Sequence, residues 1–167
     1  MKVKLQPLSA EAFAPFGQIV SRPTTEPDAR VEGGALHYWA DVMVLPPFGG
    51  PVGVGYATVA PRPLVQTCAE RHMHGPEMMQ AAFGDMIVVV GPSLYPDEPD
   101  RLPPLEEFRA FRVAEGQAVA YYPGVWHYAP FAIDRPLCLT VLLKAGTIDD
   151  DAVFVDFSAY GALEIEI

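Results

Sequence analysis

The sequence predicts an all-β fold, either a sandwich or a barrel, and three observations support this prediction. Eighteen prolines and fourteen glycines divide the 167 residues into short segments. Those segments are rich in β-branched and aromatic residues, which favour strands over helices. Half of the residues are hydrophobic, which suffices for one buried core in a chain of this length. We therefore expect residues 1–167 to form a single domain.

A short helix is expected before the strands begin. Leu8–Phe13 is expected to be helical, because Ser9 is a suitable N-cap and Phe13 and Phe16 lie one helical turn apart. The polar, proline-bearing stretch Ser21–Arg30 is expected to be a loop. Strands are then expected at Ala35–Val44, Val52–Val59, Leu64–Met73, Met86–Val90, Phe108–Val113, Ala118–Tyr122, Ala129–Phe131 and Leu137–Lys144.

Three segments have compositions that suggest a particular environment. Met86–Val90 is apolar at every position, so it should be an interior strand covered on both faces or a strand at a dimer interface. Pro92–Pro104 carries acidic residues and several prolines and should be a surface connection. We interpret Asp149–Asp151 as a solvated acidic turn rather than a calcium site, because a full coordination shell is not evident.

The charge of the chain narrows the possible partners. A net charge of −10 argues against nucleic acid or an anionic membrane, so a small molecule is the expected partner. Cys68 and Cys138 match no zinc or redox spacing and are interpreted as buried thiols. No N-terminal apolar stretch is present, and the longest apolar run is too short to span a membrane, so we expect a cytoplasmic protein.

Two histidine motifs predict a metal site. Residues two apart on a strand project to the same face, so His72 and His74 could present two imidazoles to one ion. Glu77 has the opposite parity, but the Gly75-Pro76 pair must break the strand and could turn Glu77 back toward the same ion. The turn at Pro123-Gly124 could then deliver His127 from another strand.

Three imidazoles and a carboxylate suit a divalent transition metal such as Ni, Mn, Fe, Zn or Cu, and the ligand types leave its identity open. A lone histidine is more often a structural residue than a ligand. His37 and Trp126 are further candidates for lining a pocket, although a structural role is the simpler interpretation of each.

The two motifs, in this order and spacing, resemble the two conserved motifs of the cupins, which are small double-stranded, jelly-roll-like β-barrels. The resemblance implies His72, His74, Glu77 and His127 as metal ligands. One residue is missing between the second His and the Glu, and Gln66 stands where a Gly is usual.

A narrower resemblance covers nearly the whole chain. The opening Leu5–Gly17, Glu70-Arg71-His72, Val88–Val90 and the segment from Gly116 to His127 are similar to ureidoglycolate lyases. This resemblance implies cleavage of ureidoglycolate to glyoxylate and urea in purine (allantoin) breakdown, by a homodimeric cupin. The chain departs from the family's usual pattern at His74, at Glu77, and at Tyr128, where a second His commonly follows the Trp-His pair.

If the lyase reaction applies, several residues near the motifs are candidates for its chemistry. A proton could be relayed by Glu77, Glu70, Tyr121 or Tyr122. The substrate carboxylate could pair with Arg71 or Lys144. Two alternatives stay open: another metal-dependent cupin enzyme, such as a dioxygenase, isomerase or decarboxylase acting on a small carboxylic acid, or a cupin that binds a small ligand without catalysis.

Overall fold

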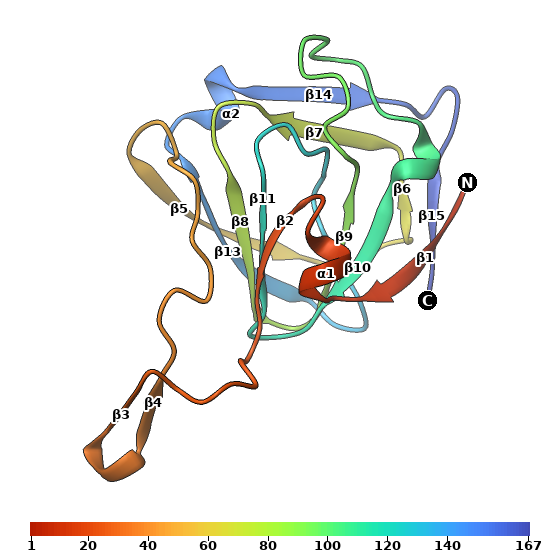
Figure 1. Ribbon diagram of the computed structural model, residues 1–167. Coiled ribbons are helices and arrows are strands. Elements are labelled where there is room, and N and C mark those ends of the chain that lie inside the picture. Colours follow the sequence, from red (N-terminus) through yellow and green to blue (C-terminus); the bar gives the residue numbers. More distant parts are fainter.

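The structure is a computed structural model that describes all 167 residues, and most of its strands belong to two curved sheets (Figure 1). The larger sheet has the order β12-β9-β10-β1-β15-β6, and these strands are Phe131–Ala132, Met86–Val90, Arg109–Val113, Lys2–Pro7, Leu163–Glu166 and Val65–Gln66. The smaller sheet has the order β2-β11-β8-β13-β5, and these strands are Gly17–Val20, Ala118–Tyr121, Glu77–Phe83, Leu137–Lys144 and Val52–Val59. The predicted all-β fold is therefore confirmed.

Two short ribbons complete the strand set. β7 (Cys68–His72) pairs with β14 (Ala152–Asp156), and β3 (Ala29–Val31) pairs with β4 (Leu36–Tyr38) in a hairpin that projects away from the barrel (Figure 1). The helical elements are brief, and none is long and apolar enough to cross a membrane. They are α1 (Ala10–Phe13), α2 (Thr147–Asp150) and the 3₁₀ turns η1 (Glu32–Gly34) and η2 (Leu105–Glu107).

The N-terminal helix is confirmed, and it begins as the sequence predicts. The Ser9 side chain accepts a hydrogen bond from the Ala12 backbone N–H at 3.2 Å, which caps the first turn. Phe13 is fully buried and meets Phe111 edge-on, with ring centroids 5.2 Å apart. The helix therefore fixes the start of the chain against the barrel core.

The strand β9 separates two hydrophobic cores. Met86, Val88 and Val90 pack into the core that contains Phe13 and Phe111. The intervening residues of β9 pack into a second core with Trp126, Phe157 and Leu163. Because every residue of β9 is buried, the prediction of an interior strand covered on both faces is confirmed.

Several expected strands differ in extent, and others were not expected at all. Leu64–Met73 divides into β6 and β7, and only Leu36–Tyr38 of the segment Ala35–Val44 is a strand. The sequence analysis missed β8 because Met, Gln and Ala have little preference for strands. Hydrogen bonds to β11 on one side and β13 on the other make this segment a strand. The strands at the two chain ends, β1 and β15, pair in parallel with each other, a long-range contact that local patterns do not reveal. Cys68 and Cys138 are free and partly exposed rather than buried.

Candidate functional site

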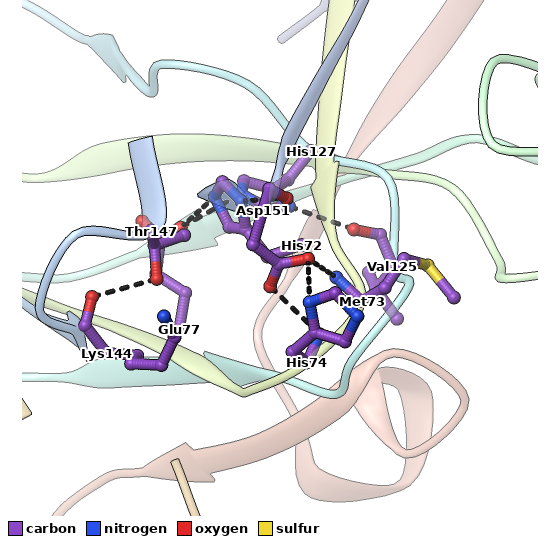
Figure 2. Close-up of polar contacts among 9 residues, drawn as sticks. All are labelled: His72, Met73, His74, Glu77, Val125, His127, Lys144, Thr147 and Asp151. Atoms are coloured by element: carbon purple, nitrogen blue, oxygen red, sulfur yellow. Dashed lines mark hydrogen bonds and ion pairs between the residues drawn. The ribbon is translucent and has the colours of Figure 1, made fainter. Parts of the chain in front are cut away.

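The side chains of His72, Glu77 and His127 converge inside the barrel (Figure 2). One Glu77 carboxylate oxygen, Oε2, lies 3.1 Å from His72 Nε2 and 3.0 Å from His127 Nε2. All three residues are buried, and one ligand atom from each lies within 4.8 Å of the others. This group could hold a metal ion, because it offers two imidazole nitrogens and a carboxylate around a common point.

The chain brings the three residues together through two turns. β7 ends at His72 and β8 begins at Glu77, so the turn between these strands changes the direction of the chain and brings Glu77 back to His72. The second turn contains Gly124, whose φ of 81° favours glycine, and its N–H donates to the His72 carbonyl at 2.6 Å. Glu70 and His127 then exchange two backbone hydrogen bonds of 2.6 and 2.9 Å. Both histidines are thereby fixed by backbone contacts.

The orientation of both imidazole rings suits metal binding. His127 Nδ1 lies 2.9 Å from the Val125 carbonyl, and His72 Nδ1 lies 3.4 Å from the Asp151 carbonyl. A ring whose Nδ1–H donates to a carbonyl presents the lone pair of Nε2, and both Nε2 atoms face Glu77. The donor set therefore fits a divalent transition metal, as the sequence predicts.

His74 does not join this group, which differs from the expected four-ligand site. The strand ends at His72, so the alternation that would place both imidazoles on one face does not extend to His74. The His74 side chain is 72% exposed, and its Nδ1 pairs with Asp151 Oδ1 at 2.8 Å (Figure 2). The structure thus brings together three of the four predicted ligands.

Asp151 is a site residue that the sequence analysis missed. Its carboxylate accepts the backbone N–H groups of Met73 and His74, each at 2.9 Å, and its side chain is only 4% exposed. The buried position of Asp151 differs from the expected solvated turn. Its carboxylate is the acceptor for the N–H groups of the 73–74 turn, although it lies 77 or more residues further along the chain. Asp151 therefore stabilises the turn that directly follows His72 and so helps to position the His72 imidazole.

We expect Asp151→Ala to lower the affinity for added divalent metal by about 10- to 100-fold, because the turn that carries His72 would lose its acceptor. Isothermal titration of the wild type and the variant with one metal measures the change. Asp149→Ala, which removes an exposed carboxylate in the same turn, is the matched control and should bind as the wild type does. An equal loss of metal affinity in the two variants would show that the negative charge of this region, and not the 73–74 turn, sets the affinity.

A pocket of about 280 Å³ opens onto two of the three residues, His72 and Glu77. Its lining includes Glu70, His72 and Glu77 together with the apolar Val141, Leu143 and Ile148. Two carboxylates face this space, and the lining contains no Lys or Arg. An anionic ligand in the pocket would consequently need a cation that the lining side chains do not supply.

Two tyrosines were expected near the site, and only one contacts it. Tyr121 is buried and stacks on the His127 ring, with centroids 4.5 Å apart, and its hydroxyl has no hydrogen-bond partner. Burial and then the Glu77 and Glu70 carboxylates raise the pKa of Tyr121 well above its ordinary value, so it stays protonated. Tyr122 has the opposite parity on the chain, is 39% exposed and does not line the pocket.

The residues expected to bind substrate lie outside the pocket. Arg71 points to the opposite face of β7 from Glu70 and His72, where it donates to the carbonyls of the 95–99 loop. Trp126 is buried beneath the Arg71 guanidinium, which lies 4.6 Å from its ring. Lys144 pairs with Asp150 at 2.7 Å, and His37 is on the projecting hairpin.

The ionisation of the group is set by the pairing of Glu77 with the imidazoles. Burial alone would raise the pKa of Glu77, but the His127 and His72 imidazoles outweigh it and hold that pKa at about 2. Burial alone would lower the pKa of His127, but the Glu77 and Glu70 carboxylates and the Val125 carbonyl raise it above its ordinary value. Glu77 is therefore ionised in the metal-free protein, and its carboxylate favours the protonated form of His127.

This pairing predicts how the metal-free protein responds to pH. The lowered Glu77 pKa stabilises the fold above its unfolded value of 4.5, and this contribution is lost as the pH falls toward 2. The raised His127 pKa stabilises the fold below its unfolded value of 6.5, and this contribution is lost as the pH rises through the folded pKa. We expect the difference in melting temperature between chelator-treated wild type and Glu77→Gln to be largest between the two unfolded pKa values, that is, between pH 4.5 and pH 6.5. A difference that does not vary with pH would contradict the pairing.

Comparison with known proteins identifies the family. A model of the ureidoglycolate lyase family matches residues 1–159. The ureidoglycolate lyase of Pseudomonas syringae pv. syringae (strain B728a) is 30% identical over 149 residues, which are 87% of this chain and 84% of the relative. That of Escherichia coli (strain SMS-3-5 / SECEC) is 30% identical over 155 residues, or 90% and 92% of the two chains.

Among solved structures, oxalate decarboxylase of Bacillus subtilis aligns over 64% of this chain with a TM-score of 0.43 and 18% identity, and the chain spans 24% of its length. The sequence relatives cover most of both chains, and the family model covers nearly all of this one. The protein is a member of the ureidoglycolate lyase family.

Proposed function

We propose that the protein is a C–N lyase of the amidine-lyase type that cleaves ureidoglycolate into glyoxylate and urea. Family membership supports the substrate, and the observation that supports the chemistry is the buried group of His72, Glu77 and His127, two of whose members, His72 and Glu77, line a pocket. The reaction breaks the bond between the hydroxyl-bearing carbon and the urea nitrogen. The hydroxyl loses a proton and becomes the aldehyde of glyoxylate, the nitrogen gains a proton, and no water is consumed.

The same group would hold a divalent metal through His72 Nε2, Glu77 Oε2 and His127 Nε2. When bound, the metal supplies positive charge for the substrate's carboxylate and lowers the pKa of its hydroxyl. Two features of the protein support this assignment: both Nδ1 atoms are directed at backbone carbonyls, and the pocket lining offers no Lys or Arg of its own.

Glu70 is proposed to move the proton from the hydroxyl to the leaving nitrogen. It lines the pocket beside His72 and Glu77, and unlike Glu77 it is not engaged by an imidazole hydrogen bond. Burial raises the pKa of Glu70, which favours proton exchange nearer neutral pH. Tyr121 keeps its proton and packs against His127, so it is assigned to holding that ring rather than to accepting protons.

The apolar wall of the pocket completes the arrangement. Val141, Leu143 and Ile148 line the same pocket as the carboxylates and limit the water around them. A compact substrate with one carboxylate fits a space of about 280 Å³. The pocket therefore suits a small hydroxy acid.

The direct test supplies ureidoglycolate to the metal-reconstituted protein and measures glyoxylate, urea and ammonia. A lyase releases glyoxylate and urea in equal amounts and no ammonia. Glu70→Gln should lower turnover by about 100-fold or more and remove one limb of the pH profile, with metal content unchanged. Stoichiometric metal without glyoxylate release would favour a different reaction of a small carboxylic acid.

A further inference from the structure

A second cavity adjoins the pocket that contains His72 and Glu77. It has a volume of about 340 Å³ and shares Gly55, Leu143 and Ile148 with that pocket, so the two spaces are continuous. We call this second cavity the outer lobe; residues 53–55 of β5 and residues 143–149 line it. The compact substrate proposed above fits the pocket at the metal group, which leaves the outer lobe without an occupant.

The outer lobe is formed where β5 lacks side chains on its inward face. Ala57 of β5 packs against the barrel core, and Gly53 and Gly55 have the same parity on the strand. Gly53 pairs with Leu143 of β13, and Gly55 pairs with Val141. The two glycines therefore leave space beside two aliphatic side chains.

The backbone does not require glycine at either position. Neither residue has a positive φ, and the register of β5 with β13 is continuous, so the glycines mark no turn and no bulge. A Cβ atom would lie 3.6 Å from its nearest neighbour at Gly53 and 3.7 Å at Gly55, which are ordinary van der Waals distances. Glycine in a strand also occurs where a ligand approaches closely, and space for a ligand explains both positions.

The lining of the outer lobe favours a neutral, apolar occupant. Ile148 is 76% exposed although it is aliphatic, and Leu143 beside it is only partly buried. A ligand that covers these side chains would remove apolar surface from water. Lys144 is the one cation of the lining, and it already pairs with Asp150 at 2.7 Å. An anionic group would have to break this pair, whereas an apolar group gains from the walls as they are.

We propose that the outer lobe is a second subsite of the catalytic pocket, which takes a neutral apolar group at the end of the substrate distant from the metal. Gly53 and Gly55 then determine how large this group can be. The ligand class is α-hydroxy acids with an apolar tail. For the reaction, which rests on the proposed function, the class is ureidoglycolates that carry an alkyl group on the distal nitrogen.

The alkyl group takes no part in the chemistry. The bond between the hydroxyl-bearing carbon and the nearer nitrogen breaks, the hydroxyl proton is lost, and that nitrogen gains a proton, as for ureidoglycolate itself. The products are glyoxylate and the alkylurea. The subsite therefore changes which substrates bind and leaves the reaction unchanged.

The first test measures binding without turnover. Lactate, α-hydroxybutyrate and α-hydroxyhexanoate are titrated into the metal-reconstituted protein by calorimetry. Once the chain enters the outer lobe, each buried methylene should tighten binding by about fourfold. Gly53→Val places a side chain in the outer lobe and should remove most of the preference for α-hydroxyhexanoate over lactate, with Gly53→Ala intermediate. Val52→Ile enlarges a residue of the same strand that lines neither space, so it should keep the wild-type preference.

The second test measures turnover of ureidoglycolate and of its propyl derivative on the distal nitrogen. Gly53→Val should lower the ratio of kcat/KM for the propyl compound to that for ureidoglycolate by about 10- to 100-fold. Circular dichroism checks that each variant folds, and Gly53→Ala serves if Gly53→Val does not.

The two tests separate the subsite from the proposed reaction. If neither compound is cleaved but binding still tightens with chain length, the proposed reaction is contradicted and the subsite is supported. If the wild type cleaves ureidoglycolate but its affinity for the acids does not rise with chain length, the subsite is overturned. The same conclusion follows if the affinity rises equally in the wild type and in the Gly53 variants.

Discussion

His127→Ala is expected to abolish metal binding and to lower the turnover of ureidoglycolate by about 1000-fold or more. The substitution removes one of two imidazoles that face Glu77, and it leaves that buried carboxylate with a single partner 3.1 Å away. Metal content by mass spectrometry and glyoxylate release measure the two effects in the same preparation. Bound metal and glyoxylate release should be lost together, because His127 Nε2 is one of the proposed metal ligands and the reaction is proposed to need the metal.

His74→Ala is the matched control for this experiment. It removes the imidazole that was expected to be a fourth ligand and that the structure places at the surface, paired with Asp151. We expect the variant to retain stoichiometric metal, with an affinity lowered by less than about tenfold through the loosened Asp151 contact. Loss of metal in His74→Ala as complete as in His127→Ala would restore the four-ligand site.

Arg71→Met is expected to destabilise the protein by about 3 kcal/mol, because three backbone carbonyls of the 95–99 loop would lose the donor that the buried guanidinium supplies. Arg71 donates to the carbonyls of Pro99, Tyr95 and Glu98 at distances between 2.7 and 3.0 Å, and it is fully buried. Methionine keeps the apolar stem of the side chain, so the effect isolates the guanidinium. Urea-induced unfolding of the two proteins measures the change in the free energy of unfolding.

Arg112→Met is the control for a surface guanidinium. Arg112 pairs with Asp85 at 2.7 Å, but its side chain is 58% exposed, so its loss should cost less than about 1 kcal/mol. If the two variants lost the same amount of stability, the contacts of Arg71 with the 95–99 loop would not be what makes it important. If Arg71→Met instead raised KM at unchanged stability, the original expectation of a substrate contact would be supported.

The predictions from sequence were accurate where a local pattern determines the outcome. The Ser9 cap, the uninterrupted apolar run of β9 and the turn that re-aims Glu77 all depend on neighbours in the sequence. The position of Arg71 could also have been predicted from the sequence. On a strand Arg71 projects to the face opposite Glu70 and His72, which places its guanidinium outside the pocket.

Other features depend on contacts between distant segments, and no local pattern reveals them. His74 could share a face with His72 only if β7 continued past His72. The strand ends at His72 instead, in a turn whose N–H groups are bound by Asp151. Asp151 resembles its exposed neighbours in sequence, and only the fold brings it to the N–H groups of Met73 and His74. A strand was expected at Ala35–Val44 and a loop at Ser21–Arg30, whereas the structure has a hairpin in which Leu36–Tyr38 pairs with Ala29–Val31, and this pairing is not visible in either segment alone.

The position of β9 between the two cores has a consequence for how the protein unfolds. Removing either core would expose one complete face of β9, so neither core can open while the other stays intact. The two cores should therefore be lost in a single cooperative step. The amides of Val88 and Val89, whose side chains lie in different cores, should exchange with solvent at the same rate, and that rate should follow global unfolding.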